Sequence, residues 1–96
     1  MRLHVIVRGR VQGVGFRWFV RGEARALELR GWVKNRRDGG VEVEASGPTH
    51  AIEALRRTLA EGPPGAHVTD VEELPAAGGA EATEDGELPF PFEIAR

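Results

Sequence analysis

The 96-residue chain contains no cysteine and no tyrosine, and only 6% of its residues are aromatic. The lack of cysteine excludes disulfide bridges, thiol catalysis and thiolate metal sites. No apolar run approaches the roughly 20 residues that span a bilayer, and the first residues enter a strand pattern without the apolar core of a signal peptide. The three histidines are too widely spaced to indicate a metal site, and we expect them to be structural or exposed. We therefore expect one monomeric, cytoplasmic domain over residues 1–96.

A net charge of −2 conceals a strong asymmetry along the chain. Residues 1–37 carry ten basic and two acidic side chains, which sum to +8, whereas residues 38–96 carry three and thirteen, which sum to −10. Two interpretations are open. Folding mixes the two halves on one surface, or the basic half gathers around a site and steers an anion toward it.

Hydrophobic periodicity predicts strands over residues 2–8, 31–36, 40–45 and 66–74, and helices over 17–30 and from Pro48 to Gly62. Asp38-Gly39 indicates a hairpin between the second and third strands. A terminal strand is expected over 90–94, at a sheet edge because of Pro91. Residues 76–89 are rich in glycine, alanine and acids without a core pattern, which favours a mobile acidic loop.

This order of elements is typical of an α+β fold, the ferredoxin-like βαββαβ sandwich. Two helices are expected on one face of an antiparallel sheet, with the other face partly open and an extra short C-terminal edge strand.

Three glycines, at positions 9, 13 and 15, precede the first predicted helix. Glycines let backbone amides approach a ligand, and the helix start adds free N–H groups and a positive dipole end, so this segment predicts an anion site. The spacing matches neither a nucleotide P-loop nor the dinucleotide fingerprint. A purely structural glycine turn remains the alternative. Arg17 is either a phosphate ligand in the first helical turn or a solvent-facing residue.

Asn35 is the second candidate. It shares strand parity with Val33, so it is expected to point to the helix-covered face at the end of its strand. An amide there can accept from a water and donate to an oxyanion. Turn chemistry beside Asp38-Gly39 explains an asparagine equally well.

Two segments carry a family resemblance. Val7-x-Gly9-x-Val11-Gln12-Gly13-Val14-x-Phe16-Arg17 resembles the first signature of the acylphosphatase family, and Gly31-Trp32-Val33-Lys34-Asn35, followed by Gly39, Val41 and Gly47, resembles the second. The resemblance implies hydrolysis of the carboxyl–phosphate bond of acyl phosphates by direct water attack, without metal or cofactor. It assigns phosphate binding to the amides of Gln12, Gly13, Val14, Gly15, Phe16 and Arg17 and to the Arg17 side chain. It assigns orientation of the attacking water to Asn35. The implied partners are a small acyl phosphate and the product inorganic phosphate, with no nucleic acid and no membrane.

Three points stay open at this level. Many family members end in an aromatic residue after an arginine, whereas this chain ends in Arg96, which has no assigned role. A related domain begins the hydrogenase-maturation carbamoyltransferases, but nothing follows it here, which favours a stand-alone enzyme. No pattern in the sequence indicates a pocket for the acyl group. The alternative function is a ferredoxin-like module that binds RNA or an anion without catalysis. Against RNA, the expected open face offers Glu42 and Glu44 rather than stacking aromatics.

Overall fold

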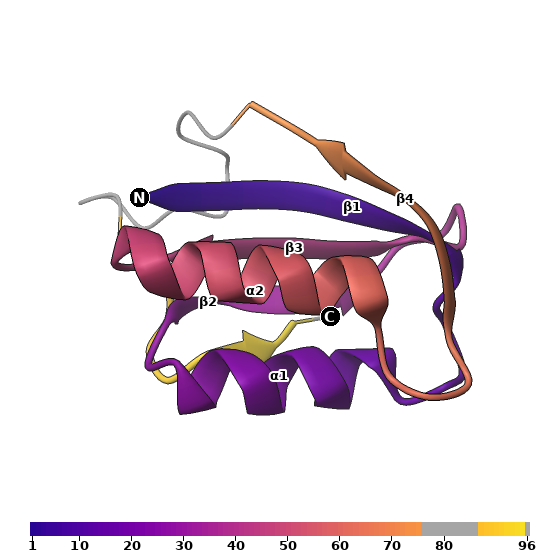
Figure 1. The fold of residues 1–96 in the computed structure, drawn as a ribbon, viewed down its shortest axis with the longest axis horizontal. Helices are drawn as coiled ribbons and strands as arrows, with labels where there is room; N and C mark the ends of the chain where they lie inside the picture. The colour runs from indigo at the N-terminus through magenta and orange to yellow at the C-terminus, as the bar shows by residue number, and fades with distance from the viewer. Residues whose placement is uncertain (76–86, 96) are drawn as a thin grey trace.

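The computed structural model describes residues 1–75 and 87–95. They form a five-stranded sheet with two helices on one face (Figure 1). The elements, in chain order, are β1 (Arg2–Arg10), α1 (Phe16–Ala26), β2 (Arg30–Asn35), β3 (Val41–Ser46), α2 (Thr49–Glu61), β4 (His67–Glu73) and β5 (Glu93–Ile94). The predicted ferredoxin-like α+β order is confirmed. Neither helix of the described residues is long and apolar enough to cross a membrane.

The strand order is β4-β1-β3-β2-β5. β1 pairs antiparallel with β3 and β4, and β2 with β3, as expected. The predicted edge position of the last strand is confirmed. β5 runs parallel to β2, a direction that the sequence did not predict, so the sheet as a whole is mixed. The segment that precedes β5 passes the beginning of β2, where the Gly31 amide donates to the Pro89 carbonyl at 2.8 Å. It therefore continues in the same direction as β2.

The core lies between the sheet and the helices. Alternate residues of the central strands point into it because strand side chains alternate between faces. The helices supply apolar residues at three- and four-residue spacing. Its members are at most 1% exposed and include Leu3, Val5, Val7, Val33, Val41 and Val43 from the strands and Phe16, Val20, Ile52, Leu55 and Leu59 from the helices. Burial of such a side chain contributes about 1.5–3 kcal/mol.

α1 ends at Ala26, so the prediction of a helix to residue 30 is wrong at its C-terminus. The Leu29 amide donates to the Ala24 carbonyl at 2.9 Å and the Glu28 amide to the Arg25 carbonyl at 3.0 Å. Glu28 has φ of 57°, so the pattern is a Schellman motif with a glutamate in the left-handed position that glycine usually takes. The motif turns the chain and buries Leu29.

The face of the sheet opposite the helices is less open than expected. Glu42 is 7% exposed and Glu44 is fully buried, with an Oε2 atom 3.2 Å from the Arg2 Nε. Leu88 is 1% exposed, although its segment shows no core pattern, and its carbonyl accepts from Arg30 Nε at 2.9 Å. Of the predicted mobile loop at 76–89, only residues 87–89 lie within the described part, and they contact the rest of the fold.

Candidate active site

Topology brings the two candidate segments to one edge of the sheet. β1 and β2 are both antiparallel to β3, so they run in the same direction. The end of β1, the beginning of α1 and the end of β2 therefore lie at the same end of the molecule (Figure 1). Arg17 stands in the first turn of α1 and Asn35 is the last residue of β2.

The loop between β1 and α1, residues 11–15, is called the glycine loop below. Gly13 and Gly15 have φ of 76° and 77°, in the left-handed region. A Cβ at either position would meet no atom within 4 Å, so the backbone conformation, and not crowding, requires glycine there. Gly9 differs, because a Cβ there would lie 2.1 Å from the His67 carbonyl oxygen. That glycine serves the close packing of β1 against β4.

The glycine loop places backbone N–H groups at the N-terminus of α1, where they are available to a ligand. Gly15 is the N-cap, no side chain caps the helix, and the first turn contains no acid. In the described residues 1–75 and 87–95, none of the backbone hydrogen bonds of turns, loops and helix caps has its donor amide among residues 12–18. Free amides and a positive dipole end together form an anion site. Phe16 is 1% exposed and buries its ring in the core, so only its amide is available.

The side chain of Gln12 makes contacts that the sequence did not indicate. Its Nε2 donates to the carbonyl oxygens of Arg36 at 2.7 Å and Gly40 at 2.9 Å. These carbonyls lie on either side of the β2–β3 turn, and Arg36 directly follows Asn35. One side chain thus joins the glycine loop to the hairpin that carries Asn35. A glutamine in a glycine-rich segment has no periodicity that would reveal such a contact.

Asn35 points as predicted. It pairs in register with Val41, as Val33 does with Val43, and these three valines are core residues. Directly opposed residues share a face, so Asn35 lies on the helix side, at the exposed end of the strand. It lines a hollow of about 550 Å³ together with Lys34, Arg36, Arg37, Asp38 and Glu42.

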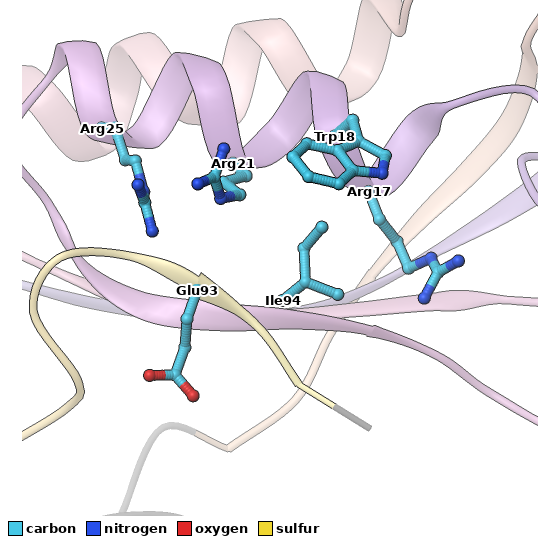
Figure 2. A pocket seen from close by; sticks show the side chains of 6 residues that line it. All are labelled: Arg17, Trp18, Arg21, Arg25, Glu93 and Ile94. Atoms are coloured by element: carbon cyan, nitrogen blue, oxygen red, sulfur yellow. The ribbon is translucent and has the colours of Figure 1, made fainter.

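Arg17 lines a different hollow, of about 530 Å³, between α1 and β5. We call it the α1–β5 hollow; its other lining residues are Trp18, Arg21, Arg25, Glu93 and Ile94 (Figure 2). Ile94 pairs with Val33, and Asn35 lies two residues farther along β2, about 7 Å at the usual strand rise. The backbone of Asn35 thus lies close to β5, although Lys34 and Glu42 of its hollow belong to the other face of the sheet. Arg17 and Asn35 thus line two different hollows.

Glu42 fastens the hairpin from the far face of the sheet. With the proton on Nε2, His4 donates to Glu42 at 2.6 Å, and Arg36 Nη1 donates to the same carboxylate at 3.0 Å. Burial raises the pKa of Glu42, but the hydrogen bonds from His4 and Arg36 outweigh burial, and the pKa lies below its ordinary value. His4 is thus structural, as expected, but it has an acidic partner that its sequence position did not predict.

Asp38 closes the hairpin turn. Its Oδ1 accepts from the Gly40 amide at 3.0 Å, and its Oδ2 lies 3.0 Å from both Arg8 Nη1 and Arg36 Nε. The Gly40 amide, followed by the two guanidinium groups, holds the pKa of Asp38 well below its usual range. The carboxylate therefore stays ionised at neutral pH, and the turn next to Asn35 is held by two ion pairs and one hydrogen bond from a backbone amide.

The basic residues of the first 37 positions differ in whether they pair with acids. Four arginines of residues 1–37 form ion pairs with acids of residues 38–96: Arg2, Arg8, Arg30 and Arg36. Within the described residues Arg17, Arg21 and Arg25 form no ion pair, and all three line the α1–β5 hollow. Uncompensated positive charge therefore collects beside the glycine loop. The described chain holds no group of three or more His, Asp or Glu side chains arranged for a metal ion.

Comparison with known proteins identifies the family. The acylphosphatase family model matches residues 3–84. The chain belongs to the acylphosphatase family. The acylphosphatase of Cupriavidus pinatubonensis is 52% identical over 75 residues, which cover 78% of this chain and 83% of that protein. The crystal structure of the Bacillus subtilis acylphosphatase is 40% identical and matches with a TM-score of 0.83 over 99% of this chain and 98% of that one. The acylphosphatase structure from Coxiella burnetii matches with a TM-score of 0.77 at 40% identity. The resemblance expected from the two segments is confirmed.

Proposed function

We propose that the protein hydrolyses acyl phosphates, with the glycine-loop amides and Arg17 binding the phosphoryl group and Asn35 orienting the attacking water. The acylphosphatase activity follows from family membership and from relatives about half identical to the chain. The assignment of roles is supported chiefly by the two hydrogen bonds of Gln12, which hold the anion site against the turn that follows Asn35.

The proposed reaction is a single displacement at phosphorus. The water oxygen forms a bond to phosphorus while the bond from phosphorus to the bridging oxygen breaks. The carboxylate leaves with the electron pair of that bond. One proton of the water stays on the phosphate and the other passes to solvent, so the products are a carboxylate and inorganic phosphate.

Positioning and charge stabilisation are sufficient for this chemistry. A carboxylate is a good leaving group, so the step requires no strong general base. Phosphoryl transfer spreads negative charge over the peripheral oxygens, and preorganised donors stabilise that charge. An arginine contacts two phosphate oxygens at once. An amide held by the hairpin places the water for in-line attack, which removes much of the entropic cost.

We further propose that the protein acts in the cytoplasm as a monomer on small acyl phosphates, without metal, nucleic acid or membrane. The guanidinium group of Arg17 and the amides of the glycine loop provide the positive charge that a metal supplies elsewhere. The alternative of an RNA-binding sheet is not favoured, because Trp32 on the far face is 3% exposed and the neighbouring Glu42 and Glu44 are buried acids.

The proposed activity is tested with purified protein, acetyl phosphate and benzoyl phosphate in excess chelator. We expect hydrolysis of both substrates and an undiminished rate when chelator is added. Loss of the rate in chelator and its recovery with a divalent metal would contradict the metal-independent mechanism. A complete lack of hydrolysis in a folded protein would contradict the function itself.

The roles are tested by comparing Arg17→Ala with Asn35→Ala. Arg17→Ala is expected to lower kcat/KM about 10²–10³-fold and to abolish binding of inorganic phosphate in calorimetry. Asn35→Ala is expected to reduce kcat to a similar degree while phosphate still binds. Arg57→Ala, on an exposed face of α2, serves as the matched control and should leave both readouts unchanged. Equal loss of phosphate binding in both site variants would refute the division of roles.

A further inference from the structure

The α1–β5 hollow extends the anion site along the helix. Four of its residues come from α1 and two from β5 (Figure 2). Arg17, Arg21 and Arg25 are spaced by four residues, so they lie on one side of α1, each about 6 Å farther along the axis. A phosphoryl group bound at Arg17 therefore stands at one end of the hollow. The remaining length is available to the part of the substrate attached to it.

The hollow offers an apolar surface next to the phosphoryl end. Trp18 is 64% exposed, which is unusual for a tryptophan, and Ile94 points from β5 toward the helix. The guanidinium of Arg21 lies over the Trp18 ring, 4.9 Å from its centroid. This contact limits the motion of both side chains, so the ring and the charge are presented together.

Within residues 1–75 and 87–95, the arginines of the hollow form no ion pair. Arg21 has no acidic partner in the described part of the chain. Glu93 belongs to the lining, but its carboxylate points away from α1, on the other side of β5 (Figure 2). Arg25 donates its Nε to the Phe92 carbonyl at 2.7 Å, which holds β5 against the helix while its charge remains uncompensated. Beyond Arg17, Arg21 and Arg25 thus line the hollow without an ion pair to any acid of the described residues.

We propose that the α1–β5 hollow is the acyl-binding subsite and that it selects acyl phosphates whose acyl group carries a second negative charge. Trp18 and Ile94 contact the carbon skeleton, and Arg21 binds the distal anion. The proposal rests on the proposed function, because it takes Arg17 as the phosphoryl ligand. No pattern in the sequence indicated this hollow, because it forms only when β5 is placed beside α1.

The test compares two substrates with the same aromatic ring and a different group at its far end. The probes are 4-carboxybenzoyl phosphate and 4-methylbenzoyl phosphate, which share an aromatic ring and differ in charge at the far end. We expect the folded protein to favour the carboxylated substrate about tenfold in kcat/KM at low ionic strength, the size expected of one charge-assisted hydrogen bond. We also expect the preference to decrease as salt is added, because the hollow is open to solvent.

Two variants distinguish the proposed contacts. Arg21→Gln is expected to bring the ratio of the two kcat/KM values close to one, whereas Arg57→Gln on α2 should leave the ratio as in the parent. Trp18→Ala is expected to lower kcat/KM for both aromatic substrates relative to acetyl phosphate. Both side chains are at least partly exposed, so circular dichroism should show an intact fold.

The outcomes separate the two proposals. If no acyl phosphate is hydrolysed, the proposed function fails. If both substrates are hydrolysed but the parent shows no preference, or if Arg21→Gln retains the preference, the acyl subsite is refuted while the function stands. A preference that Arg21→Gln removes and Arg57→Gln preserves supports the subsite.

Discussion

The side-chain amide of Gln12 donates to the carbonyl oxygen of Arg36 at 2.7 Å, across 24 positions of sequence. A second hydrogen bond to Gly40, at 2.9 Å, spans the other side of the same turn. The glycine loop and the β2–β3 hairpin are thereby held in one arrangement by a single side chain. Under the roles proposed above, this arrangement sets the separation between the phosphoryl group and the water at Asn35, and we propose that Gln12 is a positioning residue.

Gln12→Leu keeps approximately the same volume and removes both donors. We expect kcat to fall about tenfold while inhibition by inorganic phosphate changes little, because the loop amides remain. The free energy of unfolding should decrease by about 1–3 kcal/mol, the sum of two ordinary hydrogen bonds. Steady-state kinetics, phosphate inhibition and urea unfolding measure these effects. Gln12→Glu, which has the same size but cannot donate when ionised, should behave similarly, and full kcat in Gln12→Glu would contradict the positioning role.

Gly15 and Gly22 form a matched pair, since a Cβ would meet no atom within 4 Å at either position. Gly15 has φ of 77°, so Gly15→Ala should lower the free energy of unfolding by about 1 kcal/mol and disturb the anion site. Gly22 lies inside α1, so Gly22→Ala should raise the free energy of unfolding by about 0.5–1 kcal/mol. Thermal unfolding compares them, and a shift of the same sign in both variants would contradict the conformational explanation.

Glu28 adopts a left-handed backbone, with φ of 57°, at the end of α1. Glu28→Gly should therefore raise the free energy of unfolding by about 1 kcal/mol, measured in urea. The control is Glu53→Gly, at an exposed position within α2, which should lower stability by about 1 kcal/mol because the backbone there is helical. A loss of stability in Glu28→Gly would show that the left-handed position is not strained.

Acid should weaken the fold partly through Glu42 and Asp38, whose pKa values in the folded protein lie below their ordinary values. A lowered folded pKa contributes stability above the unfolded pKa, and the contribution is lost as pH falls through the folded value. The free energy of unfolding should thus decrease between about pH 5 and pH 2. Glu42→Gln should make the decrease of the unfolding free energy with falling pH shallower, as measured by urea unfolding at several pH values. An unchanged slope against pH would contradict the contribution of Glu42.

Local patterns predicted much of the fold. The alternation of Val41 and Val43 with glutamates located β3 and its core face, and strand parity placed Asn35 on the helix side. Asp38-Gly39 indicated the hairpin because the turn needs residues that tolerate φ above zero, as at Gly39 with φ of 94°. These properties reside within a few neighbouring residues, which is why sequence was sufficient.

Features that depend on distant contacts were not predictable. Leu88 is buried although no neighbouring residue alternates with it. The Schellman motif at Glu28 lacks the glycine that marks such an end, and the direction of β5 depends on where the chain returns to the sheet. The hydrogen bonds of Gln12 and the α1–β5 hollow likewise depend on which segments meet after folding. The roles proposed for Arg17 and Asn35 remain predictions until the variants are measured.

β3 carries two kinds of side chain on its two faces, valines toward the helices and Glu42 and Glu44 toward Arg2, His4 and Arg36. A slip of β3 by one position along β1 would move the carboxylates into the apolar core and the valines to the ionic face. Both changes are strongly unfavourable, since an unpartnered buried charge and an exposed apolar row each raise the free energy. The strand therefore accepts a single alignment, and misaligned intermediates should not accumulate during folding.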